Sequence, residues 1–81
     1  MAGQPQLRES AVLYGSDPYV PEAMVRLEER MDGTGWLLHV NHPAREPTVT
    51  TEHPDPRSAR AHLERVYAAG RELGRWEIRG R

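Results

Sequence analysis

The chain of 81 residues contains no cysteine, no lysine and no phenylalanine. The lack of cysteine excludes disulfide bonds, thiolate metal ligands and thiol nucleophiles. All 11 basic residues are arginine, which we attribute to a GC-rich, bacterial-like coding composition and not to a need for guanidinium groups. Large aliphatic side chains are also few, with six valines, one isoleucine and seven leucines. This composition predicts a single small domain with a thin core.

The chain has almost no net charge and no long apolar run. The formal net charge is −1, so no bulk field attracts a polyanion. The longest apolar stretches are residues 11–14 and 66–69, which are too short for a signal peptide or a membrane span. We therefore expect a cytoplasmic protein that does not act at a membrane.

Most of the chain divides into short periodic segments. Residues 1–10 hold Gly, Pro and Gln, and predict a flexible N-terminal arm before a single α+β domain over residues 11–79. Within this domain, short strands are predicted at residues 11–14 and 75–79. Two further strand-type runs, residues 36–42 and 48–53, are separated by a short proline-containing connection that suits a hairpin.

The register of this hairpin follows from its apolar residues. If Trp36, Leu38 and Val40 face the core, Val49 must lie opposite Val40, so that the numbers of paired residues add up to 89. The other face of the hairpin then carries Leu37, His39, Asn41, Thr48, Thr50 and Glu52.

Residues 20–31 fit two periodicities, and they decide the predicted fold. On a helix, Val20, Ala23, Met24, Leu27 and Met31 form one narrow apolar stripe. On a strand, alternate residues would share a face, and residues 32–35 would form a hairpin loop. Pro21 weakens the start of a helix, but the stripe favours one.

With this helix, the order of elements is βαββαβ, which resembles the split βαβ arrangement of ferredoxin-like domains. This resemblance implies a small antiparallel sheet with two helices on one face. The strand interpretation gives a three-stranded sheet plus one C-terminal helix, which looks like the small arm-binding domains of tyrosine recombinases.

The C-terminal half has the strongest helix signal. Asp55 suits an N-cap and Pro56 a first helical residue, and the apolar period continues to Leu73 before Gly74. The apolar stripe contains Ala59, Leu63, Val66, Gly70 and Leu73, with Tyr67 at its edge. The predicted core consists of Trp36, Leu38, Val40, Leu63, Val66, Leu73, Trp76 and Ile78.

No constellation of catalytic or metal-binding residues is evident. The register places His42 and His53 at opposite ends of the hairpin and His39 on the other face, so that these histidines do not predict a metal site. The serines lie outside any nucleophile-elbow sequence, and Gly33-Thr34-Gly35 lacks the rest of a phosphate-binding loop. We therefore predict no catalytic residue and no cofactor.

The charges are distributed unevenly between the two parts of the chain. Residues 1–56 carry a net charge of −5, whereas residues 57–81 carry +4. On an ideal helix, four basic residues project to one side, as a candidate contact for phosphates or an acidic partner: Arg57, Arg60, Arg71 and Arg75.

Two functions from different classes remain. The first is a non-catalytic interaction or regulatory module that binds another protein or forms a homodimer, with Leu37 and His39 on the open sheet face as interface residues. The second, less favoured, is a module that contacts the DNA backbone through the arginine stripe.

Overall fold

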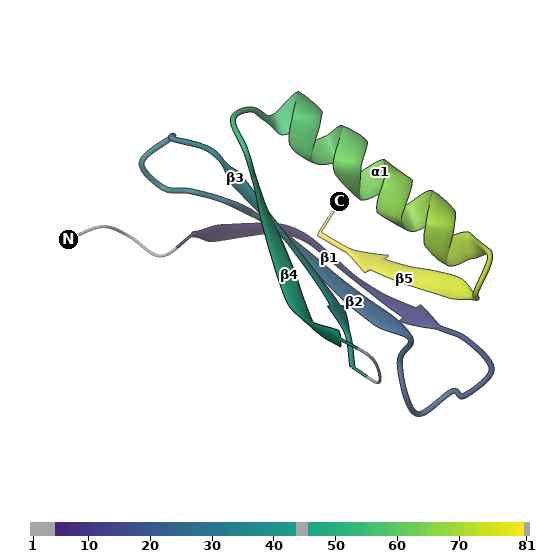
Figure 1. The fold of residues 1–81 in the computed structure, drawn as a ribbon. Helices are drawn as coiled ribbons and strands as arrows, with labels where there is room; N and C mark the ends of the chain where they lie inside the picture. The colour runs from purple at the N-terminus through teal and green to yellow at the C-terminus, as the bar shows by residue number, and fades with distance from the viewer. Residues whose placement is uncertain (1–4, 44–45, 81) are drawn as a thin grey trace.

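A computed structural model describes residues 5–43 and 46–80. The elements follow the chain as β1 (Gln6–Tyr14), β2 (Ala23–Glu29), β3 (Trp36–His42), β4 (Glu46–His53), α1 (Pro56–Arg71) and β5 (Arg75–Arg79). The strands form one antiparallel sheet in the order β4-β3-β2-β1-β5. Figure 1 shows α1 lying along one face of this sheet, and β5 returning beside β1. The architecture is thus α+β with two layers.

The predicted helix at residues 20–31 is wrong, and the alternative interpretation of this segment as a strand is correct. The segment holds the strand β2 instead of a helix, so the ferredoxin-like order is lost. Its alternate residues Ala23, Val25 and Leu27 are buried against the helix, whereas Val20 and Met31, the ends of the predicted helical stripe, are at least half exposed. The three-stranded alternative fails too, because β1 and β5 join the same sheet.

The first strand begins earlier than predicted. Residues 6–10, which we assigned to a flexible arm, lie in β1 and pair with β2 through a bulge between Leu7 and Glu9. Glu9 is 1% exposed. Residues 1–4 of the predicted arm lie outside the described part of the chain.

The predicted hairpin register is confirmed. Trp36 lies opposite His53, Leu38 opposite Thr51 and Val40 opposite Val49. The pairing slips beyond Val40, where His42 lies opposite Glu46, and the turn contains residues 44–45, which are not described. The two faces of the hairpin are therefore assigned correctly from its alternation.

The helix also begins where the sequence predicts. Asp55 is its N-cap, and the Asp55 carboxylate accepts a hydrogen bond of 2.7 Å from the backbone N–H of Ser58. The helix ends at Arg71, with Glu72 as C-cap. Within the described residues, no helix has the length and apolar character needed to cross a membrane.

This cap gives a prediction for acid stability. The hydrogen bond from the Ser58 N–H lowers the pKa of Asp55 below its usual value of 3.8. The ionised carboxylate therefore stabilises the fold above that value, and this contribution disappears as the pH falls through the lowered pKa. Asp55→Asn keeps a good capping side chain that does not titrate. We expect similar urea midpoints for the two proteins at pH 6 and a smaller loss in the variant on acidification, measured by circular dichroism; identical pH profiles would contradict the prediction.

The core lies between α1 and the covered face of the sheet. Its fully buried apolar members are Ala11, Val25, Leu27 and Leu38 on the strands and Ala59, Leu63 and Tyr67 on the helix. Five partly buried side chains pack against them: Trp36, Val40, Val66, Trp76 and Ile78. Seven of the eight residues that the sequence predicts for the core therefore belong to this cluster or pack against it.

The predicted core was wrong at the end of the helix. Leu73 lies beyond α1 and is 51% exposed, so it does not belong to the core. Tyr67, predicted at the edge, is fully buried with its ring edge-on to Trp76, at a centroid distance of 5.0 Å. The approach of Trp76 requires Gly70, since a Cβ atom there would come within 2.5 Å of the Trp76 ring.

Candidate functional site

The face of the sheet opposite α1 carries side chains from all five strands, and no described element covers it (Figure 1). Strand pairing places three arginines and three glutamates on this uncovered face, namely Arg26, Arg75, Arg79, Glu28, Glu52 and Glu77. Leu37 and His39 also lie on this face, as their alternation predicts. Their role at an interface stays a prediction.

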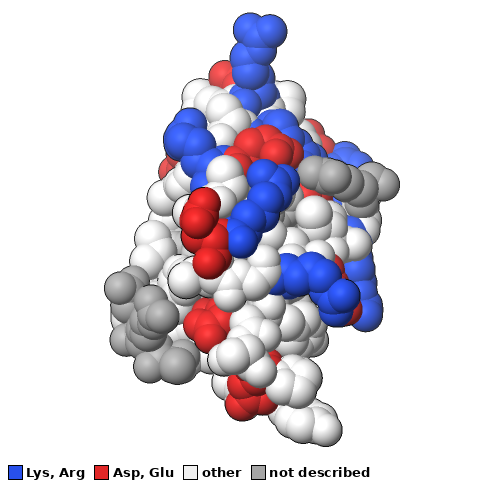
Figure 2. All heavy atoms as spheres, turned by 90° about the vertical axis from the view of Figure 1, so that its right-hand side faces the viewer, with Lys and Arg blue, Asp and Glu red and all other residues white. Residues whose placement is uncertain are grey.

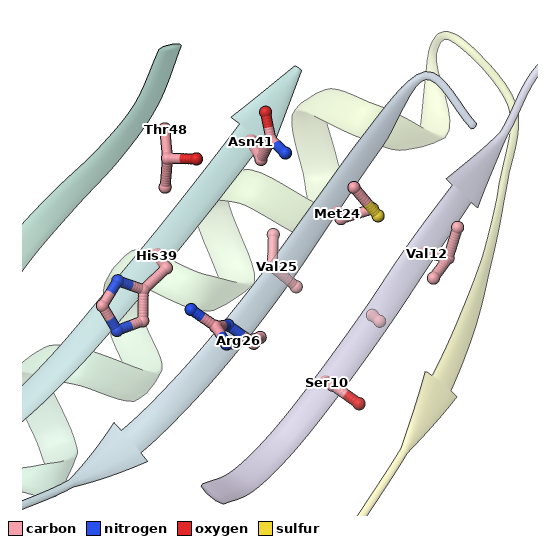
Figure 3. A pocket seen from close by; sticks show the side chains of 9 residues that line it. Ser10, Val12, Met24, Val25, Arg26, His39, Asn41 and Thr48 are labelled. Carbon is pink, nitrogen blue, oxygen red and sulfur yellow. The ribbon is translucent and has the colours of Figure 1, made fainter. Parts of the chain in front are cut away.

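A shallow hollow of about 370 Å³ lies in the uncovered face. Figure 3 looks onto it with α1 behind the sheet; Val12 and Met24 lie at one side, and Arg26 next to His39 at the other. Small or polar side chains line the rest of it, namely Ser10, Asn41 and Thr48, and the strands at Ala11 and Val25 form its floor. The hollow thus combines an apolar part with hydrogen-bonding groups, as binding surfaces do.

A polar line crosses three strands beside the hollow. His39 on β3 is joined through Nε2 to Glu28 Oε1 on β2, at 2.5 Å, and through Nδ1 to Thr50 Oγ1 on β4, at 2.8 Å. Acid, imidazole and hydroxyl also form the chain of groups used in nucleophilic catalysis. However, His39 and Thr50 lie opposite each other in the sheet ladder, on an open face with only a shallow hollow. This arrangement provides no set of donors for an oxyanion. The two hydrogen bonds therefore orient the His39 ring, and we assign no catalytic role to Glu28, His39 and Thr50.

The arginine stripe is not a free basic surface. Arg60 points towards the sheet, with Nη2 3.0 Å from the buried Oε1 of Glu9 and Nη1 3.8 Å from Glu64. The contact with Glu9 raises the pKa of Arg60. Arg75 belongs to β5 instead of the helix, and its guanidinium lies 3.7 Å from Glu77.

Of the four predicted arginines, only Arg57 and Arg71 are both on the helix and exposed, at its two ends. Figure 2 shows the end of the molecule where the helix finishes, with acidic side chains between the basic ones. Acidic groups thus interrupt the predicted track for a phosphate backbone, which needs several unneutralised cations.

Sequence reasoning missed the buried carboxylate of Glu9. Its Oε2 accepts a hydrogen bond of 2.5 Å from the Tyr67 hydroxyl, while Oε1 faces Arg60. Glu9, Ala11 and Leu13 alternate on the covered face of β1. Extending the predicted strand by two residues towards the N-terminus would have identified this position.

A second missed feature is a cluster of Thr51, His53 and His62 between β4 and α1, all partly buried. His53 Nε2 lies 3.1 Å from His62 Nδ1, and the two rings meet edge-on. Thr51 Oγ1 is 3.1 Å from His53 Nε2 and 3.3 Å from His62 Nδ1. Burial lowers the pKa of His62, with smaller contributions from His53 and Arg65. His62 is a fourth histidine in the sequence, but the hairpin register places only the three strand histidines, so its contact with His53 was missed.

Comparison with known proteins found no matching family model, no matching curated protein and no matching solved structure.

Proposed function

We propose that the protein is a non-catalytic interaction module that associates with a second copy of itself through the uncovered face of its sheet. The observation that carries this proposal is the one-sided packing: α1 covers one face, and the other presents a hollow with apolar side chains among charged ones. A chain of 81 residues buries a limited share of its surface on folding. Pairing two such faces extends that burial.

The charges on the uncovered face favour a second copy over a polyanion. Arg30 also reaches this face through its ion pair with Glu52, so four arginines lie beside three glutamates, and the small net charge gives little attraction for phosphate. In a dimer with a two-fold axis, each face meets its own pattern in reverse. Arg26 and Glu28 lie two residues apart on β2. A two-fold rotation can therefore place Arg26 of each copy opposite Glu28 of the other copy, so that opposite charges meet.

The edges of the sheet are less suited to association. β4 contains Pro47, which lacks a backbone N–H for pairing. At the other edge, β5 alternates charged residues with Trp76 and Ile78, which face the helix. Proline and charge on edge strands are typical protections against pairing with another strand. The face is therefore the surface on which we place the interface.

Sedimentation equilibrium between about 10 µM and about 1 mM tests the proposal, since weak dimers dissociate over such a range. We expect the average mass to rise towards twice that of the chain. Leu37→Arg should shift the equilibrium towards the monomer by at least about tenfold, because it replaces an apolar side chain with a cation on the face that the dimer buries. The variant should fold, because Leu37 lies opposite Glu28 and Glu52, which can pair with the new guanidinium.

Leu73→Arg is the matched control, because Leu73 is an exposed leucine beyond the helix and away from this face. It should dimerise as the unchanged protein does. A monomer at every concentration, or equal dimerisation of Leu37→Arg, would overturn the proposal. If the monomer instead bound duplex DNA with an affinity that falls steeply with salt, contact with the DNA backbone would replace self-association as the function.

A further inference from the structure

We propose that Thr51, His53 and His62 form a binding site for a divalent metal ion of the zinc class. This inference goes beyond the proposed function and is independent of it, since the cluster lies on the helix side of the sheet and not on the uncovered face. Thr51 and His53 are two residues apart on β4, and His62 reaches them from the second turn of α1.

The distances between the three donor atoms fit one face of a tetrahedral metal site. His53 Nε2, His62 Nδ1 and Thr51 Oγ1 form a triangle with sides of 3.1, 3.1 and 3.3 Å. Two ligands that each lie about 2.0–2.1 Å from Zn²⁺ at a tetrahedral angle are about 3.3–3.4 Å apart. An ion about 1 Å above the plane of this triangle would therefore lie at bonding distance from all three atoms, once the two rings turn so that their nitrogen lone pairs point at it.

The chemistry of the two rings also suits such an ion. Neutral imidazole is the preferred nitrogen ligand of zinc, copper and nickel. Without metal, nitrogens 3.1 Å apart must share a proton in a hydrogen bond. A bound ion takes the place of that proton, which moves to the outer nitrogen of its own ring.

The set of ligands limits the strength of the site. The hydroxyl of Thr51 is a weak third ligand, and water must complete the tetrahedron. The described residues provide no group of three or more His, Cys, Asp or Glu side chains close enough to hold a metal. The ion therefore binds reversibly to a protein that is already folded, and ties the edge strand β4 to the helix. His53 also lines a hollow of about 420 Å³ with Trp36 and Pro54, through which an ion can enter.

The test is a Zn²⁺ titration of the full chain without a histidine tag, followed by calorimetry and by NMR of the histidine ring protons. We expect one ion per chain, and perturbation of the rings of His53 and His62 before those of His39 and His42. His62→Gln should lower the affinity by more than about tenfold, because even the loss of an outer-shell partner costs about 10–100-fold. His42→Gln is the control and should bind zinc as the unchanged protein does.

A second variant, His53→Gln, removes the other nitrogen ligand and should weaken binding in the same way, even if His62→Gln disturbs the helix. At a Zn²⁺ concentration close to the dissociation constant of the unchanged protein, the metal should raise the melting temperature of that protein and have a much smaller effect on both ligand variants. Zinc affinity in both ligand variants equal to that of the unchanged protein, or zinc that leaves the rings of His53 and His62 unperturbed, would overturn the proposal. One ion for every two chains would do so as well, because it would place the metal between copies instead of within one chain.

Discussion

Leu63→Ala should lower the free energy of unfolding by about 2–4 kcal/mol, as expected for a leucine that is fully buried between a helix and a sheet. Leu63 is 0% exposed and belongs to the cluster that joins α1 to the sheet. Its truncation removes apolar contacts from both layers at once. The cluster has only seven fully buried apolar members, so few neighbouring side chains can move to fill the cavity that the truncation leaves. Urea unfolding followed by circular dichroism measures the loss.

Leu73→Ala is the matched control for this prediction, since it makes the same chemical change at a half-exposed position. It should cost less than about 0.5 kcal/mol, as surface substitutions usually do. The two leucines belonged to one predicted helical stripe, and the structure separates them. Equal losses in the two variants would show that the end of the helix packs against the sheet after all.

The elements predicted correctly are those with strong local signals. At Asp55 and Pro56, the capping side chain and the fixed proline backbone mark the start of the helix without reference to the rest of the chain. In the β3–β4 hairpin, the strands are adjacent in sequence, so the alternation around Leu38 and Val40 determines both faces and the register.

Residues 20–31 could not be assigned in this way, because their local pattern fits a strand as well as the helix that it favours. Ala23 and Leu27 belong to both the helical stripe and the alternating face. The segment forms a strand because it pairs with β1 on one side and with β3 on the other. Both partners lie outside the segment, so its own sequence does not show these pairings. Helix propensity is too weak to resist such pairing within a sheet.

The candidate sites depend on contacts between elements, which the sequence does not display. The uncovered face could be predicted for β3 and β4 alone, since β1 and β2 were not recognised as their neighbours. His62 meets His53 only because the helix packs back over the last strand of the hairpin. Helical geometry gives the direction of Arg60 but cannot reveal the buried acid beneath it.

The contact between Arg60 and Glu9 leads to the second large effect that we expect. The side chain of Glu9 is 1% exposed and that of Arg60 is 42% exposed. The carboxylate of this pair is therefore buried, whereas solvent reaches the guanidinium. Arg60→Met keeps most of the apolar stem but removes the positive charge that lies 3.0 Å from the buried carboxylate, which keeps its hydrogen bond from the Tyr67 hydroxyl. We expect a loss of about 1–3 kcal/mol in the free energy of unfolding, below the range for fully buried pairs because solvent reaches the guanidinium.

The double variant Arg60→Met with Glu9→Gln distinguishes the burial of a charge from a simple loss of packing. Glutamine has almost the same shape as glutamate, and its amide oxygen can still accept the hydrogen bond from Tyr67. Since no charge then remains to be stabilised, the double variant should recover at least half of the stability that Arg60→Met alone loses. Urea unfolding of the two single variants and the double variant completes this thermodynamic cycle. If the two losses simply add, the guanidinium does not stabilise the buried carboxylate, and the methylene stem of Arg60 accounts for the whole effect.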